Sequence, residues 1–111
     1  MAVLTVTPVT RSGYNLTDAL TAAGVSGDSW ACNGVELLVV KNASASSVTV
    51  TLTYAGTFDG ATPTNKTVVV GAGKTYLIGP FAQSLYNDAN QRANVTYSAV
   101  TDVTVAVFRL G

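Results

Sequence analysis

Apolar and polar residues alternate along several short stretches of the chain, with turn-forming residues between the stretches. The clearest alternation covers residues 48–54, where Val50 and Leu52 share one face and Thr49 and Thr51 share the other. Successive side chains of a strand point to opposite faces, so this pattern predicts a strand with one face on a core. Val and Thr dominate the other stretches too, and branching at Cβ favours the pleated backbone.

Further strands are predicted at short intervals. Residues 35–42 are almost continuously apolar, which is typical of a central strand covered on both faces. The remaining predicted strands are 3–7, an edge strand at 28–32, 66–70, 74–78, 91–100 and 102–110. This spacing predicts an all-β chain: a single-domain β-sandwich over residues 1–111, jelly-roll or immunoglobulin-like, of about seven or eight antiparallel strands.

The connections carry their own signals. Residues 15–24 have apolar positions at helical spacing between a capping residue, Asn15, and a terminating glycine, so a short helix and an ordered loop fit equally well. Residues 71–73, Gly-Ala-Gly, predict a tight hairpin turn with positive φ. Thr101 and Asp102 predict a second hairpin turn, between the last two strands.

Composition narrows the class of protein. Hydrophobic residues make up 48% of the chain and charged residues only 11%, against about 25% charged residues in ordinary soluble domains. Much of the surface is therefore uncharged, or part of it is buried against other chains. The net charge is zero and the charges are spread along the chain, so we expect no nucleic-acid partner. We expect no membrane association either, because there is no signal peptide and no apolar stretch of about 20 residues.

Candidate chemistry is sparse. The chain has no His and one cysteine, Cys32, which excludes an intrachain disulfide and a Cys-based zinc site. We expect Cys32 to be a buried, unreactive thiol. Residues 71–75, Gly-Ala-Gly-Lys-Thr, resemble part of a phosphate-binding loop, but the first glycine is misplaced and a strand pattern follows. The sequence therefore predicts a protein that is not an enzyme and has no cofactor or metal.

The carboxylates support the same expectation. The five aspartates are assigned to loops and turns, where Asp side chains accept hydrogen bonds from nearby backbone N–H groups. Glu36 alone lies within a strong predicted strand, and we expect it at a solvated or interface position. Asn87, Asp88 and Asn90 offer oxygen ligands for calcium, although the spacing of an EF-hand is absent.

Two regions are candidates for contact with a partner. Phe81, Leu85 and Tyr86 are large apolar residues in an otherwise polar link, where they either plug one end of the sandwich or form a contact surface. The two chain ends are the other candidates: an exposed N-terminal strand containing Leu4 could extend a neighbouring sheet, and Arg109 could lie at a contact rim. Both faces of the last strand are largely apolar, so it is either central in the sandwich or packed on another subunit.

The order of these motifs resembles a known class of proteins. A T-x-T-P strand precedes V-E-L-L-V-V-K-N, S-V-T-V-T-L, G-A-G-K-T and I-G-P-F, and the chain closes with Y-N-D and V-T-Y-S-A-V-T-D-V-T-V-A-V-F-R-L. From Leu4 to Leu110 this is similar to small virion structural proteins of tailed bacteriophages, of the capsid decoration (cement) type. The resemblance contains no chemical motif and supplies no binding residues.

The resemblance implies a virion component on the capsid surface, synthesised in the bacterial host cytoplasm. Its partner would be the major capsid protein, and the chain would form a homo-oligomer, with a trimer favoured by symmetric capsid positions. The tail or the head–tail junction is the next location. An alternative function is a carbohydrate-binding module on the virion, with Trp30 and Asn33, or Tyr86 beside Asn87 and Asp88, at the sugar site.

Overall fold

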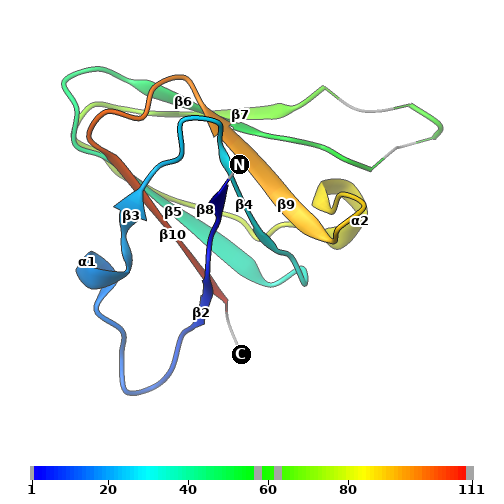
Figure 1. Cartoon of the computed structure of the whole chain (residues 1–111), viewed down its shortest axis with the longest axis horizontal. Coiled ribbons are helices and arrows are strands. Elements are labelled where there is room, and N and C mark those ends of the chain that lie inside the picture. Colours follow the sequence, from blue (N-terminus) through cyan, green and yellow to red (C-terminus); the bar gives the residue numbers. More distant parts are fainter. Residues whose placement is uncertain (1, 57–58, 62–63, 110–111) are drawn as a thin grey trace.

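Two β-sheets face each other around a shared core (Figure 1). The computed structural model describes residues 2–56, 59–61 and 64–109. The core contains Trp30, Val50 and Val95 from one sheet and Leu38 and Val105 from the other, and all five side chains are fully buried. The prediction of an all-β sandwich is confirmed at this level of two packed sheets.

The strands divide between the sheets as follows. The first sheet has the order β1 (Ala2–Val3), β4 (Asp28–Ala31), β9 (Arg92–Tyr97), β6 (Val48–Leu52) and β7 (Lys66–Val70). The second has the order β2 (Val6–Pro8), β10 (Val103–Arg109), β5 (Glu36–Asn42) and β8 (Thr75–Ile78). A short strand, β3 (Thr21–Ala22), also pairs with β10. Because β5 pairs along all of β10, β2 and β3 share the opposite edge of β10.

The strands from β3 through β10 pair in a nested, antiparallel order, the first with the last and then inward. β3 pairs with β10, β4 with β9, β5 with β8, and β6 with β7. The chain changes sheet at every connection in this series except the one between β6 and β7. Gly73 (φ +71°) and Asp102 (φ +60°) lie in turns, as predicted. The prediction that these turns close hairpins is wrong, because each turn joins strands of different sheets.

The N-terminal strand also differs from the prediction. Residues 3–7 were expected to form one strand of an antiparallel sandwich, but the segment divides into β1 and β2. β1 runs parallel to β4, and β2 runs parallel to β10. The N–H of Leu4 donates to the carbonyl of Ser29 (2.7 Å) just before the chain passes from the first sheet to the second. The N-terminal segment thus bridges the two sheets along one side of the sandwich, and β1 covers the edge of β4, which we expected to be an edge strand.

Two four-residue helices lie in the connections. α1 (Leu16–Ala19) begins after Asn15, whose side chain accepts from the N–H groups of Thr17 and Asp18, so the helical alternative for this segment is confirmed. α2 (Gln83–Tyr86) forms within the link that was expected to be irregular. No helix within the described residues is long and apolar enough to cross a membrane.

Candidate functional site

The outer face of the second sheet carries apolar side chains where a solvent-facing sheet would carry polar ones. Alternate residues of β5 point into the core, so Leu37 and Val39 point outward. Phe108 of β10 is paired with Leu37, and Leu77 of β8 is paired with Val39. Three neighbouring strands therefore place large apolar groups on the same outer face.

The α1 region covers only part of this outer face. Ala19 and Leu20 pack against a small buried cluster of Val39, Ala106 and Phe108. The ring of Tyr14 meets the ring of Phe108 edge to face, with centroids 5.7 Å apart and an interplanar angle of 69°. The α1 region therefore buries the part of the outer face that lies over β10 and leaves the part over β8 open.

The open part is a groove of about 260 Å³. It is lined by Val9, Tyr14, Leu16, Leu37, Val39, Leu77 and Phe108, which we call the apolar face. Leu77 is 65% exposed and Tyr14 is 51% exposed. None of these lining residues is charged. Contiguous exposed apolar surface on a soluble protein marks an interaction site, so the apolar face is the first candidate functional site.

Phe81, the first of the predicted contact residues, lies in the core instead. Its side chain is 1% exposed, and its ring packs edge to face on Trp30 (5.0 Å) and on Tyr86 (5.1 Å). The Cys32 thiol donates to the Phe81 carbonyl (3.4 Å). The expectation that Phe81 anchors a partner is therefore corrected, because its ring fills the interior and is not accessible from outside.

Leu85 and Tyr86 join α2 to the loop after β6. Both side chains are half-buried. The Leu85 carbonyl accepts from the N–H groups of Ala55 (2.8 Å) and Gly56 (2.9 Å), and the Tyr86 ring packs against Tyr54 with centroids 5.1 Å apart. Burial, with a smaller contribution from the hydrogen bond to Tyr54, raises the pKa of the Tyr86 phenol to about 12. These contacts favour the plug interpretation of the segment over the contact surface.

The two residues proposed at the chain ends are separated from that segment. Leu4 is half-buried and packs against the core. Arg109 is exposed at the end of β10, and its carbonyl accepts from the N–H of Val9 (3.0 Å), a residue of the apolar face. The structure thus brings the backbone of Arg109 next to Val9 of the apolar face, and Leu4 lies within the N-terminal segment that bridges the two sheets.

Each predicted sugar site loses groups to the interior or to internal hydrogen bonds. Trp30 is fully buried and cannot offer a ring to a sugar. The Asn87 amide donates to the carbonyl of Cys32 (3.2 Å). The Asp88 carboxylate accepts from the side chain of Asn94 (3.0 Å) and from two backbone N–H groups, and these hydrogen bonds, the one from Asn94 first, lower the pKa of Asp88. The Asp88 oxygens suggested for calcium are therefore already engaged.

Two further carboxylates are buried. Glu36 was expected at a solvated or interface position, but its side chain is fully buried and its Oε1 accepts from the N–H groups of Asn33 (2.7 Å) and Gly34 (3.2 Å). Asp28, at the boundary between a predicted turn and the predicted strand 28–32, begins β4; its Oδ2 accepts from Tyr97 (2.7 Å) and from the N–H of Gly24 (3.0 Å). Glu36 and Asp28 hold turns in place from inside the sandwich.

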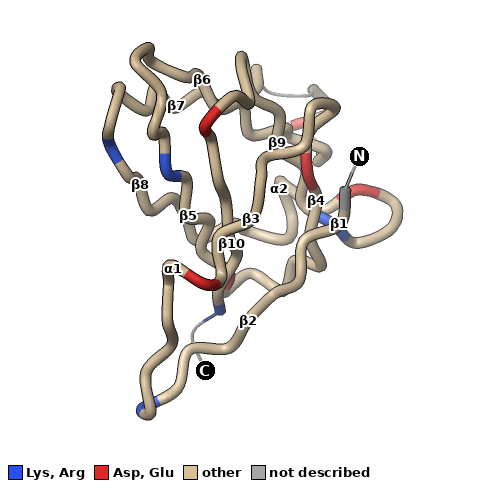
Figure 2. Tube along the Cα trace, turned by 60° about the vertical axis from the view of Figure 1, so that its left-hand side comes forward, with Lys and Arg blue, Asp and Glu red and all other residues tan. Residues whose placement is uncertain are grey.

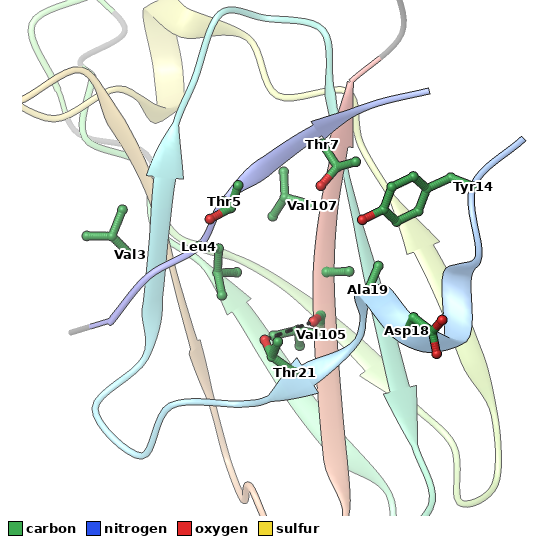
Figure 3. Close-up of a pocket in the computed structure, with 11 residues that line it drawn as sticks. Val3, Leu4, Thr5, Thr7, Tyr14, Asp18, Ala19, Thr21, Val105 and Val107 are labelled. Carbon is green, nitrogen blue, oxygen red and sulfur yellow. Dashed lines mark hydrogen bonds between the residues drawn. The ribbon is translucent and has the colours of Figure 1, made fainter. Parts of the chain in front are cut away.

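A second concavity lies where β2 and β3 meet the same edge of β10 (Figure 3). It has a volume of about 320 Å³. Its lining comprises Val3, Leu4, Thr5, Thr7, Tyr14, Asp18, Ala19, Thr21, Val105, Ala106 and Val107, and we call it the hydroxyl pocket. Tyr14 belongs to both sites: its ring adjoins Phe108, and Figure 3 shows its hydroxyl directed toward the N-terminal strand.

Sequence reasoning missed Leu37, Leu77 and Tyr14 as surface residues. One signal did point this way: both faces of residues 103–108 are largely apolar, and so are both faces of residues 35–40. Such strands are either covered on both sides within the chain or incompletely covered and open to a partner. Comparison of the chain with protein-family models, with curated proteins and with solved structures gave no significant match.

Proposed function

We propose that the chain is a structural subunit of a bacteriophage particle and docks on the major capsid protein through the apolar face. The observation that carries this proposal is the uncharged groove over β5 and β8, with Leu77 exposed at its margin. The centre of a protein–protein interface is depleted of charged residues and rich in apolar and aromatic ones. Leu37, Leu77 and Tyr14 match that composition.

The proposed fold type is a jelly roll. Jelly rolls contain eight strands in two sheets and occur in viral capsid and lectin domains. The nested order of pairing supports this type, because the first strand of the series, β3, pairs with the last, β10, and the following pairs lie successively further inside the series, ending with β6 and β7. An immunoglobulin-like sandwich would contain several hairpins between consecutive strands, whereas β6 and β7 are the only consecutive strands paired among the described part of β3–β10.

The distribution of charge supports a protein partner. Figure 2 shows basic and acidic residues interspersed over the trace, and the chain carries six of each. Such a surface offers little for phosphate-dominated binding. A shell of repeated sites would also stabilise a small domain by mass action, because binding favours the folded state. We propose a non-catalytic role as well, since Glu36 and Asp28 are buried and hydrogen-bonded to the chain itself.

Docking is tested by sedimenting the purified protein with particles that lack it. The wild-type chain should saturate the particles at a fixed ratio per capsid subunit. Leu77→Lys should weaken binding by roughly 30-fold, because it removes about 2 kcal/mol of apolar burial and adds a charge to desolvate. Val69→Lys is the matched control: Val69 is 56% exposed on β7, in the other sheet, and its substitution should leave binding unchanged.

Three results would count against the proposal. The protein could remain free in lysates and never sediment with particles, or Leu77→Lys could bind as tightly as the wild type. Alternatively, the protein could map to the tail or head–tail junction, which would retain a virion role but replace the capsid partner. The expected trimer is tested separately, by the mass of the purified protein in solution and on particles.

A further inference from the structure

We propose that the hydroxyl pocket is a binding site for a neutral saccharide, sized for one pyranose unit. This inference does not rest on capsid docking, because the hydroxyl pocket opens between β2, β3 and α1 and not over β5 and β8. Its volume of about 320 Å³ falls at the small end of the range for ligand pockets, about 300–1,000 Å³.

The shape of the pocket follows from the way β10 is paired. β3 pairs with β10 at Thr104 and Val105, whereas β2 pairs with it from Val107 onward. The two short strands therefore leave a gap between them, opposite Ala106. The side chains of Thr7 and Thr21 approach the gap from these strands, Thr5 approaches from the link before β2, and Tyr14 approaches from the segment before α1 (Figure 3).

The polar groups at the pocket are hydroxyls with unused hydrogen-bonding capacity. Within the described residues, the hydroxyls of Thr5, Thr7 and Tyr14 have no intramolecular hydrogen-bond partner. The Thr21 hydroxyl donates to the carbonyl of Val105 at 3.4 Å, a long contact that leaves its oxygen able to accept. Each hydroxyl can both donate and accept, which suits a ligand whose own groups do the same.

The rest of the lining selects the class of ligand. The part formed by β10, with Val105, Ala106 and Val107, is almost fully buried, so the apolar groups able to contact the C–H face of a sugar ring are the half-buried Leu4 and Ala19. The lining contains no Lys or Arg, and its one carboxylate, Asp18, already accepts from the side chain of Asn15 (3.0 Å). An anion would find no cation here, and a wholly apolar ligand would leave the hydroxyls unpaired.

The test is a titration of the free protein, followed by the NMR shifts of its backbone amides. The probes are D-glucose, D-galactose, D-mannose and N-acetyl-D-glucosamine, each added separately, with sodium sulfate as the anionic comparison. At ordinary ligand efficiencies a single pyranose should bind with a Kd of about 1 mM. We expect at least one sugar to give saturable shifts at Thr5, Thr7, Tyr14 and Thr21, and sulfate to give none there.

Variants separate the pocket from the rest of the surface. Thr7→Val combined with Tyr14→Phe removes two hydroxyls but keeps a β-branched residue in β2 and the ring against Phe108, so the fold should be retained. This double variant should bind the sugar about tenfold more weakly, or worse. Tyr76→Phe is the control, because Tyr76 is 40% exposed on β8, outside the hydroxyl pocket, and its variant should bind like the wild type.

The inference is overturned if none of the four sugars shifts the pocket amides in a saturable way, or if the folded double variant binds as well as the wild type. Saturable binding of sulfate in the pocket would overturn the assignment to a neutral ligand. None of these outcomes changes the result of the particle sedimentation test, so failure of one proposal is distinguishable from failure of the other.

Discussion

Asn42, at the end of β5, should be among the most costly polar residues to replace. Its side chain is fully buried. Its amide donates to the carbonyls of Ser46 (2.8 Å), Val70 (3.0 Å) and Gly71 (3.3 Å), and its Oδ1 accepts from the N–H (3.0 Å) and hydroxyl (2.6 Å) of Ser44. One side chain thus ties the turn after β5 to the turn that carries the chain from β7 to β8.

The expected loss follows from this count. The amide has two hydrogens, so Asn42 makes about four good hydrogen bonds, each contributing about 1 kcal/mol net. Asn42→Ala should therefore lower the free energy of unfolding by about 4 kcal/mol. For a chain of this size, each 1 kcal/mol lowers the Tm by about 4 °C, so the Tm should fall by roughly 16 °C. Asn42→Asp should cost at least as much, because it places a carboxylate oxygen against the same carbonyls.

Urea unfolding followed by circular dichroism, with thermal melts in parallel, measures both quantities. Asn33→Ala is the control, because Asn33 is exposed and, within the described residues, its side chain makes no hydrogen bond. Its variant should lose less than about 0.5 kcal/mol. A loss below about 1 kcal/mol for Asn42→Ala, with cooperative unfolding intact, would refute the assigned role of this side chain.

Further outcomes test other parts of the structure. A Cβ at Gly56 would lie 2.0 Å from a carbonyl oxygen of α2, so Gly56→Ala should reduce the free energy of unfolding by about 1–3 kcal/mol in urea titrations. Burial raises the pKa of the Cys32 thiol, so a thiol reagent should label the native protein far more slowly than the denatured protein; equal rates would contradict this. Burial raises the pKa of Tyr86 to about 12 and, with a hydrogen bond, raises the pKa of Tyr97. The two protonated phenols therefore stabilise the folded protein fully below the unfolded pKa of about 10, and this stabilisation is lost as the pH rises above that value. The Tm of the wild type should fall above pH 10, and the Tm of Tyr97→Phe should fall less steeply.

Local patterns predicted most strands, but not their partners. The alternation of residues 48–52 depends only on side-chain direction within one strand, and it matches β6. The connection made by the turn at Gly71–Gly73 could not be predicted in this way. The same local backbone can either close a hairpin or carry the chain from one sheet to the other. The division of the N-terminal strand into β1 and β2 depends on Ser29 and Val107, distant residues that no local pattern identifies.

The residues of the candidate site could not be predicted from the sequence for the same reason. Phe81 is a large apolar residue in a polar link, which fits both an anchor for a partner and a core residue, and only its contact with Trp30 decides between them. Leu77 lies in the run Tyr-Leu-Ile, which shows no alternation, so its outward direction is fixed by pairing with Val39. Tyr14 acquires its place through a ring contact with Phe108, far along the chain.

The most direct test of the docking proposal is an electron cryomicroscopy map of the phage particle at a resolution that shows side chains. We expect density for this chain on the capsid shell, with Leu37 and Leu77 buried against the major capsid protein and Val69 open to solvent. A map that places the chain on the shell with the apolar face turned to solvent, or that contains no density for the chain, would contradict it.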